Sequence, residues 1–382
     1  MVADMIWLGF ALFAGLVGYV LVGYPALLAL ASRGGRPHQK RDCEPTVSVI
    51  IPAYNGEGFL AAKLRSVLNL DYPKDKLDIL VVSDGSTDRT DELAGEFASE
   101  GVKLLRVLRG GKPAALNSSI PTVSGEILLL TDVRQNLAAN SLRRLVRSFA
   151  DPAVGVVSGE LVIGNARGGE EAEIGAYWRF ETWMRDRLSL IDSMFGATGP
   201  FYAMRRSLAV TIPPDMLLDD VYLPLSAYFK GYRLVMEKEA KAYDIATSRE
   251  TEFRRKVRTL AGNFQILMAY PALLGPGNRM WWHFVSYKLG RLLLPWALLG
   301  LLVCSALLPH PWRWPVCAVQ LGGYGLAAVD GWIPVGTKLK KLSSPARTFV
   351  VMMIAAVLAL KVFFVPPRSL WKVTSASTPG SG

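Results

Sequence analysis

The chain has 382 residues, of which 51% are hydrophobic, and its mean hydropathy of +0.26 is high for a soluble protein and indicates a membrane component. Its formal net charge of +11 would suit nucleic acid, anionic lipid or a phosphorylated substrate. Much of this charge flanks apolar segments, at 33–41 and 338–347, as in cytoplasmic loops of membrane proteins, so no nucleic-acid partner is expected. The scattered cysteines and histidines support neither a disulfide framework nor a Cys/His metal cluster.

An uncharged apolar run extends from Ile6 to Leu30. As a helix it is long enough to cross a hydrocarbon core of ~30 Å. A secretory signal is the alternative, because Ala29-Leu30-Ala31 resembles a cleavage site. However, the run is too long for the apolar core of a signal, no basic residue precedes it, and a basic cluster follows it. We therefore predict a transmembrane anchor at residues 1–32, with the N-terminus outside and the following chain in the cytoplasm.

Apolar runs alternate with helical patterns from Val47 onwards. The runs Val47–Ile51 and Ile79–Val82 lack regular polar alternation, as do strands buried on both faces of a parallel sheet. Further strands are expected at Lys103–Leu108 and Glu126–Leu130. This alternation predicts an α/β domain with a mostly parallel sheet at residues 45–250.

Acidic residues follow two of the predicted strands. Asp84 and Asp88 come after the second strand, and Asp132 comes after the strand that ends at Leu130. Ligands of open α/β sheets bind beyond the carboxyl ends of the strands, so these acids indicate a site. The alternative for Asp-Gly-Ser-Thr-Asp is a turn followed by a helix cap. The loop between the last two strands adds a glycine pair and Lys112, which suits a phosphate ligand or is only a solvated lysine.

The next segments contain helices and turns with polar signals. A helix at Ser141–Phe149 is expected to carry its arginines (Arg143, Arg144 and Arg147) on a solvated or membrane-facing side. A Gly-rich turn lies at Gly196–Gly199, and Asp219 and Asp220 stand at a later helix start, where capping is the alternative role.

The last part of the chain is predicted to lie in and on a membrane. Residues 251–275 form a basic amphipathic helix that suits the membrane surface. Three apolar segments follow near Phe284–Leu308, Pro315–Val335 and Phe349–Val365, which we assign as membrane segments within residues 281–367, followed by a tail at 368–382. Asp330 lies within an apolar stretch, where its charge is costly unless it faces a partner.

The order of these acids, with a basic RxxR helix before membrane segments, resembles the membrane-embedded family 2 glycosyltransferases, the group that includes cellulose, chitin and hyaluronan synthases. The resemblance covers Val47 to Gln265. It implies the GT-A fold, which is an α/β nucleotide-sugar-binding domain with a mostly parallel sheet, together with transmembrane helices.

The resemblance assigns a donor site at the carboxyl edge of the sheet. Pro52 and Tyr54 would contact the nucleotide, with Tyr54 beside the base, and Asp84 would read the nucleotide. Lys112 matches a loop lysine near the donor. Asp132 occupies the first position of the family's DxD motif, which implies Mg²⁺ or Mn²⁺ bridging the diphosphate, whereas Arg134 stands where a second acid is usual.

The same resemblance assigns the acceptor side. Asp220 aligns with the acid that would take the proton of the attacking hydroxyl, which implies a single displacement with inversion, and Asp219 would assist it. The predicted acceptor contacts comprise the Gly-rich turn and two aromatic side chains: Gly196, Thr198, Gly199, Trp178 and Trp183.

The basic helix differs from the QxxRW motif of processive synthases. Arg258 matches the arginine that holds diphosphate, and Arg255, which stands at the glutamine position, is assigned to the donor with it. Thr259 replaces the tryptophan, which makes single-sugar addition at least as plausible as processive polymer extension.

These features predict an inverting glycosyltransferase that moves a sugar from a UDP-sugar to a saccharide or lipid-linked acceptor, for polysaccharide or glycolipid synthesis. It would act at the cytoplasmic face of a bacterial inner (plasma) membrane and contact membrane lipid, and a homo-oligomer is left open. The alternative, suggested by the altered DxD and QxxRW motifs, is a non-catalytic nucleotide-sugar sensor or assembly subunit. A transporter is disfavoured by the few membrane segments and the large α/β region.

Overall fold

The computed structural model describes residues 1–163, 169–245 and 249–370 of the chain. These residues form two compact units. The α/β unit comprises 34–163, 182–245 and 367–370, and the helical unit comprises 1–33, 169–181 and 249–366. Helix α7 (Gly169–Ile191) contributes its first part to the helical unit and its last part to the α/β unit.

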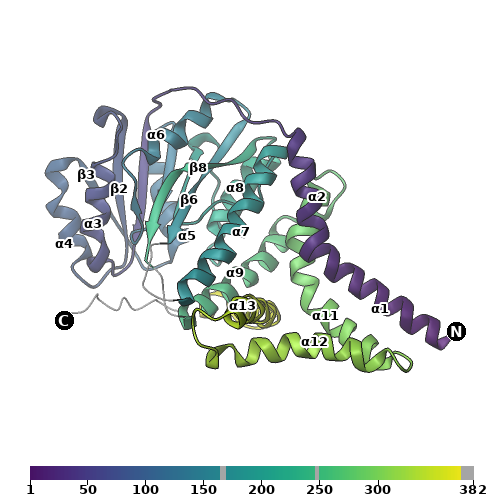
Figure 1. Cartoon of the computed structure of the whole chain (residues 1–382). Helices are drawn as coiled ribbons and strands as arrows, with labels where there is room; N and C mark the ends of the chain where they lie inside the picture. Colours follow the sequence, from purple (N-terminus) through teal and green to yellow (C-terminus); the bar gives the residue numbers. More distant parts are fainter. Residues whose placement is uncertain (164–168, 246–248, 371–382) are drawn as a thin grey trace. The chain divides into compact units, whose positions relative to one another are not determined.

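The α/β unit is built on an eight-stranded sheet with the order β3-β2-β1-β4-β7-β6-β8-β5. Strands β3, β2, β6 and β8 of this sheet are labelled in Figure 1. Its strands are β1 (Val47–Ala53), β2 (Leu77–Asp84), β3 (Val102–Val107), β4 (Ile127–Thr131), β5 (Asn136–Leu137), β6 (Val154–Ile163), β7 (Phe201–Arg205) and β8 (Arg233–Asp244). Strands β3, β2, β1 and β4 are mutually parallel, and so are β6 and β8. Strand β7 runs antiparallel to β4 and β6, and β5 antiparallel to β8, so the mostly parallel sheet is confirmed.

Helices pack against this sheet and bury its central strands. They are α3 (Glu57–Leu68), α4 (Thr90–Glu96), α5 (Lys112–Ser119), α6 (Ser141–Val146) and α8 (Asp219–Phe229). Strand β4 is buried at every residue, and β1 at every residue except Pro52, which is partly exposed. This burial explains why both strands appear in the sequence as compact apolar runs.

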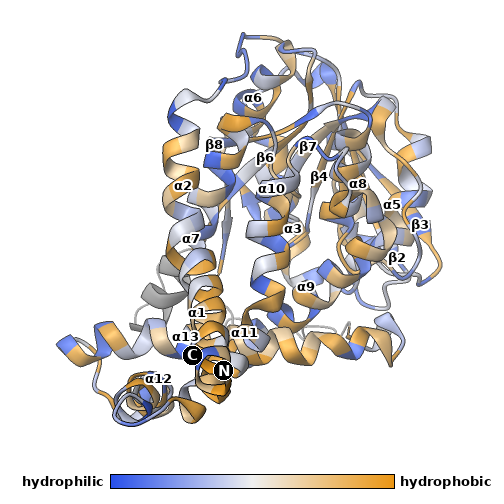
Figure 2. Ribbon diagram, turned by 90° about the vertical axis from the view of Figure 1, so that its right-hand side faces the viewer, coloured by the Kyte–Doolittle hydropathy of each residue, from blue (hydrophilic) through white to orange (hydrophobic). Residues whose placement is uncertain are grey.

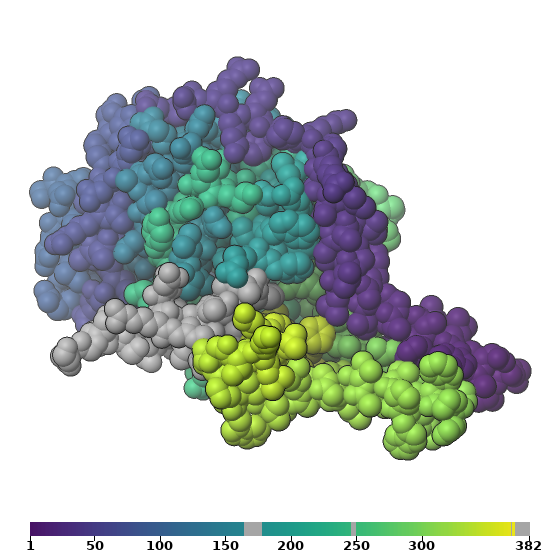
Figure 3. Space-filling model, in the orientation of Figure 1, coloured from purple at the N-terminus to yellow at the C-terminus, as the bar shows by residue number. Residues whose placement is uncertain are grey.

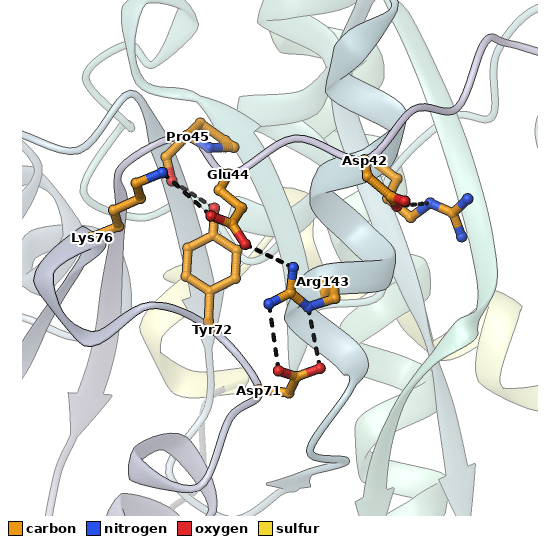
Figure 4. A network of polar contacts seen from close by, with 8 residues as sticks. Asp42, Glu44, Pro45, Asp71, Tyr72, Lys76 and Arg143 are labelled. Atoms are coloured by element: carbon orange, nitrogen blue, oxygen red, sulfur yellow. Dashed lines mark hydrogen bonds and ion pairs between the residues drawn. The ribbon is translucent and has the colours of Figure 1, made fainter.

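Arginines of α6 and of the turn after it form ion pairs within the α/β unit: Arg143 with Asp71 and Glu44, Arg144 with Glu239, and Arg147 with Asp42. Figure 4 shows the pairs of Arg143. We expected these arginines on a solvated or membrane-facing side, and their side chains are 32–38% exposed. Beside Arg143, the Tyr72 hydroxyl donates to the Pro45 carbonyl at 2.6 Å, which holds the chain entering β1.

The helical unit contains the apolar helices. These are α1 (Val2–Gly18), α2 (Tyr24–Ala31), α9 (Arg249–Ala269), α10 (Trp281–Phe284), α11 (Gly290–Leu307), α12 (Arg313–Ala328) and α13 (Lys338–Leu358). Hydrophobic residues run along α1 (Figure 2), and α1 packs beside α11 (Figure 3). A Cβ on Gly300 of α11 would lie only 2.5 Å from the Phe13 ring, so the glycine permits this close approach.

Three helical stretches of the described chain are long and apolar enough to cross a membrane: Val2–Gly34, Trp281–Leu307 and Lys338–Phe363. The segment expected at Pro315–Val335 is not among them. Helix α12 has 16 residues, or about 24 Å at ~1.5 Å per residue, which is shorter than the hydrocarbon core. Glycines at 322, 323 and 325 lower its apolar content.

Asp330, just after α12, is fully buried and surrounded by donors from α13. Its carboxylate accepts from Ser343 Oγ at 2.6 Å and Ser344 Oγ at 3.2 Å, and it pairs with Lys340 Nζ at 3.0 Å and Arg347 at 3.3 Å. Burial raises the pKa of Asp330, but these contacts outweigh burial and lower it. The costly charge seen in the sequence therefore joins α12 to the start of α13.

We expect Asp330→Asn to destabilise the chain, because Lys340 and Arg347 would remain close to each other without the negative charge that they share. Removing one partner of a buried ion pair costs about 3–5 kcal/mol of the free energy of unfolding. Thermal unfolding in detergent measures this loss. Asp4→Asn is the control, since the Asp4 side chain is 84% exposed; equal unfolding temperatures for the two variants would contradict the assignment.

Candidate active site

Three of the predicted donor residues lie at one edge of the sheet. Because β1, β2 and β4 are parallel, their carboxyl ends meet at that edge. Tyr54 follows β1, Asp84 ends β2, and Asp132 follows β4. The structure therefore brings together the side chains that the sequence placed after separate strands.

Asp84 is held in a cradle formed by the loop after β3. It is 3% exposed and accepts hydrogen bonds from the backbone N–H groups of Gly110 at 2.7 Å and Gly111 at 2.9 Å. Arg109 forms an ion pair with the same carboxylate, and its Cζ lies 3.6 Å from the centroid of the Tyr54 ring. Arg109 thus joins Asp84 to Tyr54, a role that our sequence interpretation missed.

The turn after β2 needs its glycine at this point. Gly85 has a φ of +67°, and a Cβ there would lie 2.9 Å from the backbone nitrogen of Arg109. Asp88 instead caps helices: its carboxylate accepts from the N–H groups of Thr90 and Glu57, each at 3.0 Å. The turn-and-cap alternative therefore describes Asp88, whereas Asp84 lies at the carboxyl edge of the sheet.

A lysine lies between two of the predicted acids. Lys112 begins α5, and its Nζ is 2.8 Å from Asp132 Oδ1 and 3.1 Å from Asp219 Oδ2. The Asp132 side chain is 37% exposed and that of Asp219 only 6%. Burial lowers the pKa of Lys112, but Asp132, Asp219 and Asp220 outweigh it and raise this pKa, so the lysine stays charged. It is not the solvated loop lysine of the alternative interpretation.

Asp220 is the second residue of α8 and is half-buried. Burial and the neighbouring charge of Asp219 raise its pKa to about 6, while Lys112 and Arg185 oppose the shift. The pKa of Asp219 is also raised, chiefly by burial. A carboxylate with this pKa is ionised at pH 7 and is a far better proton acceptor than an ordinary aspartate.

The Gly-rich turn packs directly on Asp220. The Ala197 N–H donates to the Asp220 carbonyl at 2.8 Å, and a Cβ on Gly199 would lie 2.6 Å from Asp220 Oδ2. Only glycine at position 199 leaves the carboxylate where it is. Gly196 has a φ of +136°, and a Cβ there would lie 2.8 Å from Val221.

Thr198 holds this turn from inside. Its side chain is 2% exposed, and its N–H donates to Ser158 Oγ at 2.8 Å. Its hydroxyl lies 3.0 Å from the same oxygen and accepts from Arg185 NH1 at 3.2 Å. Thr198 therefore fixes the turn, while Gly199 borders the carboxylate.

The position of the missing second DxD acid is occupied by a paired arginine. Arg134 NH2 lies 2.5 Å from Asp244 Oδ2 at the end of β8, and Gln135 Nε2 donates to that oxygen at 2.8 Å. No local sequence signal predicts this pairing, because the two residues are 110 positions apart.

The side chains at this edge could bind a divalent cation only together with a ligand that supplies further oxygen atoms. Within residues 1–163, 169–245 and 249–370, no group of three His, Cys, Asp or Glu side chains is arranged to hold a metal ion. Asp132 would provide one carboxylate. Mg²⁺-type sites commonly use one or two carboxylates, with phosphate oxygens and water completing the shell, so Asp132 suits a cation that arrives with a diphosphate.

The other predicted site residues lie elsewhere in the chain. Trp183 is half-buried on the part of α7 that belongs to the α/β unit. Trp178, Arg255 and Arg258 belong to the helical unit, where Arg255 NH1 pairs with Glu252 Oε1 at 2.8 Å. The donor and acceptor roles of these four residues stay predictions.

Comparisons with known proteins agree with this fold. Residues 48–212 match the glycosyl transferase family 2 profile. The chain is 25% identical over 316 residues to a beta-monoglucosyldiacylglycerol synthase of Trichormus variabilis, which covers 76% of this chain and 66% of that protein. It is 28% identical to an N-acetylglucosaminyltransferase of Rhizobium sp. strain N33, covering 66% of this chain and 60% of that protein. The chain thus spans no more than about two thirds of either relative.

The fold is shared with a solved structure. The mannosyltransferase PcManGT of Pyrobaculum calidifontis, known in complex with GDP-Man and Mn²⁺, superposes with a TM-score of 0.74 over 93% of this chain and 99% of that one, at 23% identity. The mostly parallel sheet, the acids at its carboxyl edge and the match over residues 48–212 lead to one conclusion. The chain carries a glycosyl transferase family 2 domain at residues 48–212.

Proposed function

We propose that this chain transfers a sugar from a nucleotide-sugar, expected to be a UDP-sugar, to a saccharide or lipid-linked acceptor with inversion. The observation that carries this proposal is the close approach of Gly199 to the Asp220 carboxylate. Nearby, Lys112 forms ion pairs with both Asp132 and Asp219. The proposed base, Asp220, thus lies near the charged Lys112, which can bind a diphosphate, and near Asp132, which can bind a divalent cation that accompanies the diphosphate. One relative is named as a synthase of a monoglucosyldiacylglycerol, which supports a lipid acceptor, and another as an N-acetylglucosaminyltransferase, which supports sugar transfer.

The donor is assigned to the carboxyl edge of the sheet. Tyr54 offers a stacking face for the base, and Asp84 reads the nucleotide with Arg109 beside it. Lys112 donates to the diphosphate, and Arg255 and Arg258 of the helical unit are proposed to add planar donors to it. A divalent cation on Asp132 would neutralise the departing nucleoside diphosphate.

The acceptor is assigned to the side of Asp220. Its carboxylate accepts the proton of the acceptor hydroxyl as that oxygen attacks the anomeric carbon from the face opposite the diphosphate. Gly199 leaves room at this carboxylate, and Gly196 and Thr198 shape the turn. Asp219, already bound to Lys112, holds that lysine in place, while Trp178 and Trp183 are proposed to stack on sugar rings.

We infer that the catalytic domain at 45–250 works at the cytoplasmic face of a bacterial inner (plasma) membrane, for polysaccharide or glycolipid synthesis. The anchor at 1–32, the interface helix at 251–275 and the segments within 281–367 would hold it there, followed by the tail at 368–382. Support comes from the three helical stretches able to cross a membrane and from basic residues beside them.

The decisive test is a transfer assay in native membranes with labelled nucleotide-sugars, with and without Mn²⁺, comparing the wild type with Asp220→Asn. Removing the base should reduce turnover by about 10²- to 10⁴-fold while leaving UDP binding largely intact. Near-normal turnover by the variant would refute the assigned base. Donor binding without transfer or hydrolysis by the wild type, under any condition, would instead favour the sensor alternative.

The pH dependence of turnover provides a separate prediction. Asp220 must be ionised to accept a proton, and burial with the charge of Asp219 raises its pKa to about 6. The value of kcat/KM, which reports the pKa of the free enzyme, should therefore fall as the pH decreases through about 6, by a factor of about ten per pH unit below it. A value that stays constant down to pH 4.5 would show that another group limits the proton transfer.

Gly199→Ala should block the reaction without unfolding the protein. The new methyl group would displace the Asp220 carboxylate, and a shift of about 1 Å at a reacting group costs roughly 10²-fold in rate. Gly95→Ala is the matched control, because a Cβ at this exposed helical glycine of α4 meets nothing within 4 Å. Equal rates in the two variants, measured in the transfer assay, would contradict the close approach.

A further inference from the structure

Helix α3 carries a lysine on its buried face. The face is formed by Leu60, Lys63, Leu64 and Val67, each of which is 0% exposed. Lys63 Nζ donates to Thr131 Oγ1 and to the Gln135 carbonyl, both at 2.6 Å. Its ammonium group thus lies under the loop that carries Asp132.

Burial of the Lys63 ammonium lowers the stability of the fold. Both partners of Lys63 are neutral oxygens, and a buried ammonium that lacks a carboxylate partner costs more than an apolar side chain of similar size. Burial lowers the pKa of Lys63 to about 7, while the charge of Asp132 opposes this shift. A methionine at position 63 would fill the same space without this cost, so the lysine calls for another explanation.

Lys63 contacts both ends of the loop 131–135. Thr131 and Gln135 lie on either side of Asp132, and Lys63 holds both. The Thr131 hydroxyl also donates to the Pro200 carbonyl at 2.8 Å, and the Asp132 N–H reaches the same oxygen at 3.3 Å. At the far end, the Gln135 side chain donates to Asp244. The loop is therefore fixed from below by Lys63 and from the side by β8.

The altered motif makes this support more important. Position 134 holds an arginine that pairs with Asp244, so Asp132 is the only acid left in the DxD motif. With a single carboxylate available, a small displacement of the loop cannot be compensated by a second one.

We propose that Lys63 is a positioning residue, which fixes the loop 131–135 so that Asp132 faces the cation and diphosphate of the donor. The inference rests on the proposed function for the identity of the ligand. The geometry of the ligand-free loop can be tested without it.

The first experiment measures hydrogen exchange in the full-length, ligand-free chain in detergent. Lys63→Met should increase exchange of the amides in 131–137, while peptides from β2 keep the wild-type rate. Val67→Ala, on the same buried face, is the control for a general loss of stability and should not act selectively on this loop. Unchanged exchange in 131–137 would overturn the inference, whatever the enzyme is found to catalyse.

The second experiment measures the affinity for UDP by calorimetry at saturating Mn²⁺. Substituting an outer-shell partner of a metal site commonly costs about 10- to 100-fold in affinity, and we expect a loss of this size for Lys63→Met but not for Val67→Ala. Equal affinities in both variants would contradict the role of Lys63. A wild type that binds no nucleotide would refute the proposed function, and the exchange data would still decide the positioning role.

A second pair of variants covers the case in which Lys63→Met does not fold. Thr131→Val removes the hydroxyl partner of Lys63 at nearly constant shape, whereas Thr131→Ser keeps it. Faster loop exchange and weaker UDP binding in the valine variant alone would support the inference. Equal behaviour of the two variants would refute it.

Discussion

The site depends on the neutralisation of three carboxylates that meet at one place. Strand β4 and helix α8 bring Asp132, Asp219 and Asp220 together, and like charges at such short range cannot all remain ionised unless a cation joins them. Lys112 supplies it, at 2.8 Å from Asp132 and 3.1 Å from Asp219. Asp220 keeps a raised pKa, because burial and the charge of Asp219 outweigh the opposing charge of Lys112.

A second constraint is the backbone around Asp220. The turn 196–199 approaches the start of α8 so closely that position 199 has no room for a side chain. Thr198 is locked by Ser158 and Arg185 beneath it. The carboxylate is thus confined on one side by main chain, which limits its direction.

Much of this could be predicted from local sequence. The apolar runs located the strands, and acids after strands located the edge of the sheet, because both signals are contained in a few neighbouring residues. The buried face of α3 could also have been found, since Lys63 lies in register with Leu60, Leu64 and Val67. From the sequence we noted a helical pattern between the first two strands and did not assign its buried face.

Other features depend on contacts between distant residues. Nothing near Arg109 shows that it reaches back to Asp84, and nothing near Arg134 reveals Asp244, because the fold alone creates these pairs. The difference at α12 has another origin. Apolar composition suggested a crossing, but α12 has only 16 residues, its glycines lower its apolar content, and the buried ion cluster of Asp330 follows directly after it.

The pairing of Arg134 bears directly on whether the altered DxD motif disables the site. An unpaired arginine beside Asp132 would compete with Lys112 and any cation for that carboxylate. Asp244 instead takes the guanidinium, and Gln135 shares the same acid, so the substituted position is balanced within the α/β unit. Asp132 keeps an exposed carboxylate at the end of β4. The motif thus loses one metal ligand without gaining a group that competes for Asp132. Of the two altered motifs that suggest a non-catalytic chain, only the QxxRW motif, with Thr259 in place of tryptophan, still supports that alternative.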